Sequence, residues 1–140
     1  IKFEGYTDFE DEREYFVNGE DKIDNFVVKG MDGALSLDKD IIPLNYWNKK
    51  ILNEKQVFDT QKGIIREIKV EQIEDEIIKI NEKDVITSKY ILNASTNPKD
   101  KGPFPEYTIW YAQNGELLKF KFINWKDNKE VVTQRNNWDY

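Results

Sequence analysis

Arg66 is the residue whose type and position most suggest chemistry. Within an alternating stretch of the chain it falls on the same side as Ile64, Ile68 and Val70, where an isolated charge is costly. One interpretation is that the guanidinium binds an anion or a carboxylate inside a curled sheet. The alternative is that Arg66 reaches the rim of the sheet or pairs with a nearby acid such as Asp59.

Aromatic side chains could form the walls of a binding cleft around this arginine. The candidate wall residues are Tyr46, Trp47, Tyr90 and Tyr111, with Arg66 as the polar anchor. Aromatic residues of this kind pack against apolar or amphiphilic ligands, although packing in the core is their more frequent use. The sequence therefore predicts a ligand-binding site at these five residues and leaves core packing as the alternative.

The absence of two residue types limits the catalytic chemistry. The chain has no His and no Cys, which excludes thiol nucleophiles, imidazole bases, zinc sites built from these ligands, and disulfides. The acidic runs 10–12 and 74–76 are typical of solvated surface, and the acids at 8–14 and 127–130 lack the pattern of a calcium loop. We expect no enzymatic activity, catalytic residue, metal site or cofactor. A hydrolase that uses two carboxylates remains an alternative.

Composition limits the domain count and the partners. The 140 residues carry a net charge of -6 with a pI near 4.8, and this length predicts one β-rich domain covering 1–140. The acidic balance argues against nucleic acid as a partner. No run of about 18 apolar residues is present, so we expect no transmembrane segment.

The clearest structural signal is a hairpin around Asn114-Gly115, the preferred pair for a two-residue type I′ turn. Counting outward from that turn gives the register. It pairs Tyr111 with Leu118, Ile109 with Phe120, and Tyr107 with Phe122. We expect these six side chains to face the core together. Trp110, on the other face opposite Lys119, is expected to be solvated.

Shorter alternating runs predict the rest of an all-β fold. Strands are expected at 63–72, at 76–81 and 85–93 as a second hairpin, at 24–29 and 34–37 as a third, and at 131–135. Turn signals at this spacing are typical of an antiparallel meander that curls into a partial barrel or sandwich. The first dozen residues and the loop 93–105 are expected to lie outside the ordered core.

One segment predicts a helix instead. In Pro43–Leu52, proline at the first helical position and apolar residues at Leu44, Trp47 and Ile51 fit two turns with one apolar stripe. Such a short helix is marginal in isolation. We therefore expect Trp47 to hold it against the sheet, where the helix would plug the open end of the curl. The residues Asp59 to Gly63 predict a tight turn just before the strand of Arg66.

Several short motifs resemble a known family. They are Pro43-Leu-Asn-Tyr-Trp-Asn48, Phe58-Asp-Thr-Gln-Lys-Gly63, Lys89-Tyr-Ile-Leu92 and Ile109-Trp-Tyr111 with Gly115. Their order and spacing resemble a family of secreted, mostly proteobacterial β-rich proteins that is catalogued only as a domain of unknown function. In that family a serine usually stands where this chain has Asn45. The likeness covers roughly 43–135.

The resemblance implies a location but no activity. Family members carry signal peptides, which implies a periplasmic or cell-envelope location, and they have further N-terminal strands, so we expect Ile1 to be a trimmed start. The family has no established catalytic residues. Our leading hypothesis is a non-catalytic bacterial envelope domain that binds an apolar or amphiphilic ligand or a protein partner. The second is an assembly subunit that docks through an exposed sheet edge.

Overall fold

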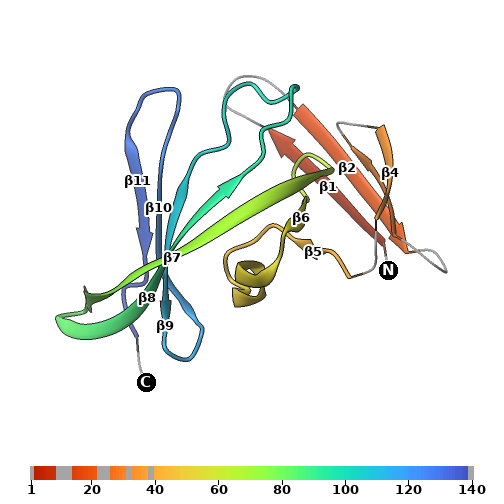
Figure 1. The fold of residues 1–140 in the computed structure, drawn as a ribbon. Helices are drawn as coiled ribbons and strands as arrows, with labels where there is room; N and C mark the ends of the chain where they lie inside the picture. Colours follow the sequence, from red (N-terminus) through yellow and green to blue (C-terminus); the bar gives the residue numbers. More distant parts are fainter. Residues whose placement is uncertain (1, 9–13, 22–25, 31–32, 38–39, 139–140) are drawn as a thin grey trace. The chain divides into compact units, whose positions relative to one another are not determined.

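The computed structural model describes residues 2–8, 14–21, 26–30, 33–37 and 40–138 (Figure 1). These residues form strands, with one short 3₁₀ helix. In chain order the elements are β1 (Lys2–Asp8), β2 (Glu14–Asp21), β3 (Phe26–Gly30), β4 (Gly33–Leu37), β5 (Ile42–Pro43), the 3₁₀ helix η1 (Lys49–Asn53), β6 (Gln56–Asp59), β7 (Ile64–Ile80), β8 (Lys83–Ala94), β9 (Tyr107–Ala112), β10 (Leu117–Ile123) and β11 (Glu130–Gln134). None of the described helical residues forms a helix long and apolar enough to span a bilayer.

The strands form two sheets. One has the order β1-β2-β3-β4, and the other has the order β11-β10-β9-β8-β7-β6-β5, with only the β5–β6 pair parallel among the described pairs. The chain divides into two compact units, one made of 1–44 and 56–67 and one made of 45–55 and 68–140. In the second unit the strands β7 to β11 curl strongly into part of a barrel (Figure 1). The predicted all-β, partial-barrel fold is confirmed.

The first unit begins with a strand that the sequence did not predict. Lys2–Asp8 forms β1 and pairs with β2 along its whole length, from Lys2 opposite Glu20 to Asp8 opposite Glu14. The expectation that the first dozen residues lie outside the ordered core is therefore wrong for 2–8, while 9–13 lie outside the described residues. The error arose because β2 supplies the backbone partners, and an acid-rich composition does not reveal them. The predicted third hairpin is confirmed as β3 and β4.

The β7–β8 hairpin, which was also predicted, has a tighter turn than expected. Ile80 pairs directly with Lys83, so only two residues form the loop. Both have positive φ, 49° at Asn81 and 66° at Glu82, which is the signature of a type I′ turn. This turn type, predicted at Asn114-Gly115, therefore occurs here without a glycine.

Replacing Glu82 with glycine should stabilise the protein. A residue with a Cβ pays about 1–2 kcal/mol to adopt the left-handed conformation, while glycine loses about 0.5–1 kcal/mol through greater freedom in the unfolded chain. The expected net gain in the free energy of unfolding is about 0.5–1 kcal/mol. Urea denaturation measures it, with Glu82→Ala as the control that keeps the Cβ and should show no gain. A loss of stability in the glycine variant would contradict the turn assignment.

The β9–β10 hairpin differs from its prediction at the turn. The N–H of Gly115 donates to the carbonyl of Ala112 at 2.9 Å, and the N–H of Ala112 donates to the carbonyl of Glu116 at 2.8 Å. With Gly115 at φ 89°, this is a three-residue loop with a left-handed glycine instead of a two-residue I′ turn. The loop moves the register by one residue.

A β-bulge in β10 restores the predicted register. The pairing shifts between Leu117 and Lys119, so one extra residue in β10 offsets the longer loop. Ile109 opposite Phe120 is confirmed, whereas Tyr111 faces Leu117 instead of Leu118. Leu118 lies in the cluster on the opposite face, so the expectation that it shares a face with Tyr111 is wrong.

Trp110 is buried, and the prediction that it is solvated is wrong. Its exposed fraction is 2%, and it packs in a cluster with Ile78, Ile80, Val85, Ala112, Leu118 and Trp138. Most of the side chains that bury Trp110 come from Trp138 and from the half of the β7–β8 hairpin that is nearest its turn. These segments are distant in sequence from β9, so the alternation within the hairpin gave no sign that its second face is also covered.

The helix is shorter than predicted and begins later. Pro43 belongs to β5, which pairs with β6, so it does not start the helix. The helix η1 begins after Asn48, whose side-chain oxygen accepts the N–H of Lys50 at 3.0 Å. Ile51 is fully buried and fixes η1, while Trp47 is 67% exposed. The expectation that Trp47 anchors the helix is therefore wrong.

Candidate functional site

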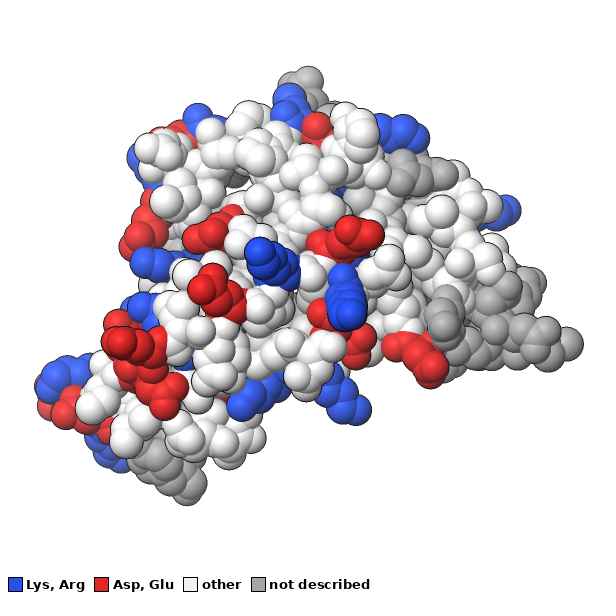
Figure 2. Space-filling view, in the orientation of Figure 1, with Lys and Arg blue, Asp and Glu red and all other residues white. Residues whose placement is uncertain are grey.

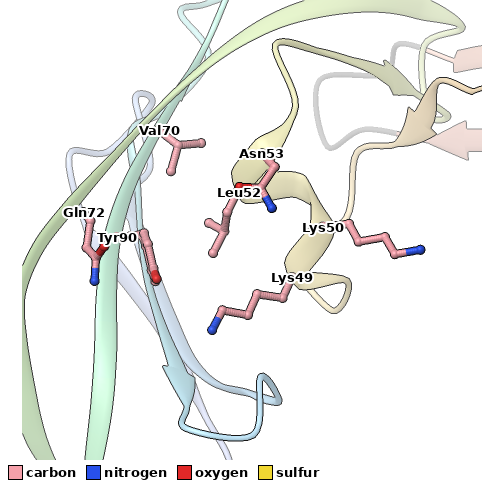
Figure 3. Close-up of a pocket in the computed structure, with 7 residues that line it drawn as sticks. All are labelled: Lys49, Lys50, Leu52, Asn53, Val70, Gln72 and Tyr90. Atoms are coloured by element: carbon pink, nitrogen blue, oxygen red, sulfur yellow. The ribbon is translucent and has the colours of Figure 1, made fainter.

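A cleft of about 490 Å³ opens in the second unit between the helix η1 and the strands β7 and β8 (Figure 3). It is lined by Lys49, Lys50, Leu52, Asn53, Val70, Gln72 and Tyr90. The first four residues come from η1, and the other three come from one face of the curled sheet.

The cleft combines apolar walls with a few polar groups. Leu52 and Val70 supply aliphatic surface, and Tyr90 supplies a ring and a hydroxyl. Asn53 and Gln72 add side-chain amides that both donate and accept hydrogen bonds. Clefts of this size and mixture are typical of small-molecule sites.

The charge of the cleft is opposite to that of the chain. None of the seven lining residues is acidic and two are lysines, although the chain as a whole carries a net charge of -6. On the molecular face shown in Figure 2, basic and acidic side chains are intermixed, with no continuous basic area. A cleft without carboxylates is therefore a local feature of the surface, and it favours a neutral or anionic ligand.

The two lysines differ in direction. Figure 3 shows the Lys49 side chain extending toward the side of the cleft that carries Tyr90, whereas the Lys50 side chain extends the other way. Lys49 is partly buried and Lys50 is exposed. The Lys49 Nζ atom lies 5.9 Å from the ring centre of Tyr111, within the range of a cation–π contact.

The wall formed by η1 and the residues before it is fastened to β9 by Tyr111. Its hydroxyl donates to the carbonyl of Tyr46 at 2.8 Å, and the Tyr46 ring lies 4.5 Å from that of Tyr107. Burial raises the pKa of Tyr111, and the neighbouring Tyr90 raises it further. Tyr111 therefore stays protonated at neutral pH and keeps its role as a hydrogen-bond donor.

Replacing Tyr111 with phenylalanine should loosen this wall. The ring is retained, but the carbonyl of Tyr46 loses its donor, which costs about 1–2 kcal/mol of unfolding free energy. The lost bond ties the 45–53 segment to the sheet. We therefore expect amide hydrogen exchange, relative to the wild type, to speed up more in η1 than in β9 and β10. Tyr90→Phe, which leaves that bond intact, is the matched control. Uniformly faster exchange across the unit would contradict a local fastening.

The structure places the four predicted aromatic residues differently. Tyr90 lines the cleft, and Tyr111 lies directly behind it with its ring centre 6.0 Å from that of Tyr90. Tyr46 packs on Tyr107 instead of lining the cleft. Trp47 is exposed, with the guanidinium of Arg135 5.7 Å from its ring centre.

Arg66 belongs to the first unit and does not line the cleft. It is 1% exposed, and its Nε atom lies 2.8 Å from Oδ2 of Asp59. The alternative explanation, pairing with Asp59, is confirmed. Of the lining residues, sequence reasoning found only Tyr90, because no local pattern shows that η1 and this face of the sheet share a cleft. It missed Lys49, Lys50, Leu52, Asn53, Val70 and Gln72.

The opposite face of the same sheet has its own polar cluster. The indole N–H of Trp110 donates to Oε2 of Glu76, and the Nζ atom of Lys89 lies 3.5 Å from Oε1 of that carboxylate. Burial raises the pKa of Glu76, but the indole hydrogen bond and the charges of Lys89 and Lys119 outweigh burial. The pKa of Glu76 is therefore lowered.

The lowered pKa of Glu76 predicts how the stability of the protein depends on pH. A carboxyl group with a depressed pKa contributes stability above its unfolded-state pKa, and that contribution is lost as the pH falls through the folded-state value. Glu76→Gln should therefore be less stable than the wild type at about pH 7, with the difference shrinking toward about pH 3. Thermal denaturation across this range tests it. A difference that grows on acidification would show that the sign is wrong.

The fold and the cleft define the class of the protein, an all-β domain with a partial-barrel sheet and an open cleft in its second unit. The chain belongs to the family described as Domain of unknown function (DUF6134), which matches residues 2–131. No curated protein and no solved structure matches the chain. The family match confirms the resemblance to a family catalogued only as a domain of unknown function.

The motifs behind that resemblance hold backbone turns. Asn45 accepts the N–H of Asn48 at 3.1 Å, and Asn48 caps η1. Oδ1 of Asp59 accepts the N–H of Gln61 at 3.0 Å, within a turn that ends at Gly63 with φ 70°. A side-chain oxygen at position 45 holds this turn by accepting one backbone N–H. The motifs at 43–48 and 58–63 therefore stabilise the local backbone.

Proposed function

We propose that this protein is a non-catalytic binding domain whose cleft beside η1 takes a small amphiphilic molecule. The observation that carries the proposal is the composition of the cleft. Aliphatic surface from Leu52 and Val70 lies beside the amides of Asn53 and Gln72 in about 490 Å³. A ligand with one apolar end and one polar end satisfies both, whereas a fully apolar ligand would leave the amides without partners.

A blocking substitution tests the proposal. Gln72 is exposed and lines the cleft, so Gln72→Trp would fill the cleft without disturbing the core. With ¹⁵N-labelled protein and octanol as the probe, we expect chemical-shift changes confined to η1, β7 and β8 in the wild type and none in the variant. Lys83→Trp, at the tip of the β7–β8 hairpin, is the control and should bind as the wild type does. No shift changes in the wild type would overturn the proposal.

The location is a proposal as well. We propose the bacterial periplasm or envelope, supported by the resemblance to secreted proteins. Fractionation of cells that express the native gene tests it, because recovery of the protein in the cytosol would count against it. A carboxylate-based hydrolase gains no support from the cleft, since no acid is among the residues that line it.

A second candidate function is assembly through the edge of β11. Within the described residues β11 pairs only with β10, and its central residues Val131, Val132 and Thr133 carry no charge. The part of β7 beyond its pairing with β6, by contrast, carries the exposed acids Glu74 and Asp75, a feature that discourages strand addition. Sedimentation over a range of concentrations tests this, with Val132→Lys expected to abolish any association. A monomer at all concentrations would exclude it.

A further inference from the structure

We propose that the ligand of the cleft carries a single negative charge, such as a carboxylate, and that Lys49 binds it. This inference rests on the proposed function and adds the chemical class of the ligand. The apolar part would lie against Leu52 and Val70, with the amides and the hydroxyl of Tyr90 completing the hydrogen bonds of the head group.

The position of Lys49 is defined by its neighbours. Its ammonium group lies 5.9 Å from the ring centre of Tyr111. Its Cδ atom is close enough to the β9–β10 turn that a Cβ built on Gly115 would lie 3.4 Å from it. The outer end of the side chain therefore has neighbours at Cδ and at Nζ, and less side-chain entropy is lost when the ammonium group binds a ligand.

The surroundings leave this ammonium group available to an anion. Lys79, Lys89 and Lys121 each lie within ion-pair distance of a carboxylate, whereas in the described part of the chain no ion pair involves Lys49. The partial burial of Lys49 and the absence of acids among the lining residues strengthen its attraction for an anion. The cation–π attraction between the Lys49 ammonium group and the Tyr111 ring is weaker than the attraction of that group for a carboxylate.

The number of ammonium groups that face the cleft determines how many negative charges on a ligand can be compensated. Lys50 also lines the cleft, but its side chain extends away from the side on which Lys49 and Tyr90 lie (Figure 3). One ammonium group therefore faces the ligand, and it compensates one negative charge. A dianionic head group would leave a second charge without a partner in a chain whose net charge is -6.

Three probes with the same alkyl chain test the charge. Octanoate, octanol and octylammonium are titrated into ¹⁵N-labelled wild-type protein at constant ionic strength. We expect octanoate to bind about tenfold more tightly than octanol, as one charge-assisted hydrogen bond predicts, and octylammonium to bind more weakly than octanol. Raising the salt concentration should weaken octanoate binding and leave octanol unchanged.

Two neighbouring substitutions test the residue. Lys49→Gln should weaken octanoate binding about tenfold and octanol binding much less, and Lys50→Gln, whose side chain extends away from Tyr90, should weaken octanoate binding less than about twofold. If octanol binds as tightly as octanoate, the inference is overturned while the proposed function stands. Equal losses in both variants would also overturn the assignment to Lys49. If none of the three probes causes shift changes in the cleft, both the inference and the proposed function fail.

Discussion

Replacing Asp59 with alanine lowers the free energy of unfolding by about 3–5 kcal/mol, the cost of removing one member of a buried ion pair. Arg66 is 1% exposed, and its Nε atom lies 2.8 Å from Oδ2 of Asp59. In the alanine variant the guanidinium stays in the interior and loses its carboxylate. Chemical denaturation measures the loss.

Asp59 pairs with Arg66 and also accepts hydrogen bonds in the turn that follows it. The control variants separate these two contributions to stability. The Oδ1 atom of Asp59 accepts the N–H groups of Gln61 and Lys62 at 3.0 and 3.3 Å, so alanine also removes a turn cap. Asp59→Asn keeps that acceptor but loses the charge, and its amide NH₂ replaces the Oδ2 atom that accepts from Arg66. Arg66→Met removes the buried charge and leaves the turn intact. The double variant Asp59→Asn with Arg66→Met replaces both charges of this pair with uncharged side chains, and we expect most of the stability to return.

The outcome also tests the assignment of Arg66 to structure. If Arg66 were instead a ligand anchor held at the rim, Asp59→Asn, which keeps the turn acceptor, would cost less than about 1 kcal/mol, as for exposed ion pairs. A loss of that size in Asp59→Asn would contradict the buried pair. Full recovery in the double variant, with octanol and octanoate binding unchanged, would show that the pair stabilises the first unit and takes no part in the cleft.

The ion pair between Asp59 and Arg66 could be predicted from the sequence alone. Arg66 and Asp59 lie seven residues apart on two strands joined by one turn, so strand alternation and turn chemistry were sufficient to suggest that they meet. The cleft was different. Lys49 and Gln72 lie on separate elements, and their approach depends on how η1 packs on the sheet, which no local pattern encodes.

The β9–β10 hairpin shows the same limit within one element. Alternation correctly placed Ile109 opposite Phe120, because cross-strand pairing follows from a nearby turn. It did not show that a longer loop and a bulge offset each other, since both turns are compatible with Asn-Gly. Nor did it show whether one face or both faces of the hairpin are covered, because the covering residues come from distant segments.

Replacing Trp110 with alanine is the sharpest test of that second covered face. Trp110 is 2% exposed and packs with Ile78, Leu118 and Trp138, so its loss leaves a large cavity and should cost about 3–5 kcal/mol of unfolding free energy. Trp110→Phe retains much of the volume but loses the N–H that Glu76 accepts, and should cost about 1–2 kcal/mol.

A lysine in the same cross-strand row supplies the matched control. The Nζ atom of Lys119 lies 4.6 Å from the centre of the Trp110 ring, and Lys119→Met keeps the aliphatic stem over the ring while removing the charge. This variant should cost less than about 1 kcal/mol. A solvated tryptophan, as the alternation alone predicted, would instead make Trp110→Ala nearly as mild as Lys119→Met, because a side chain already in water leaves no cavity when it is removed. A large gap between the two losses therefore requires that the β7–β8 hairpin and Trp138 cover this face in solution.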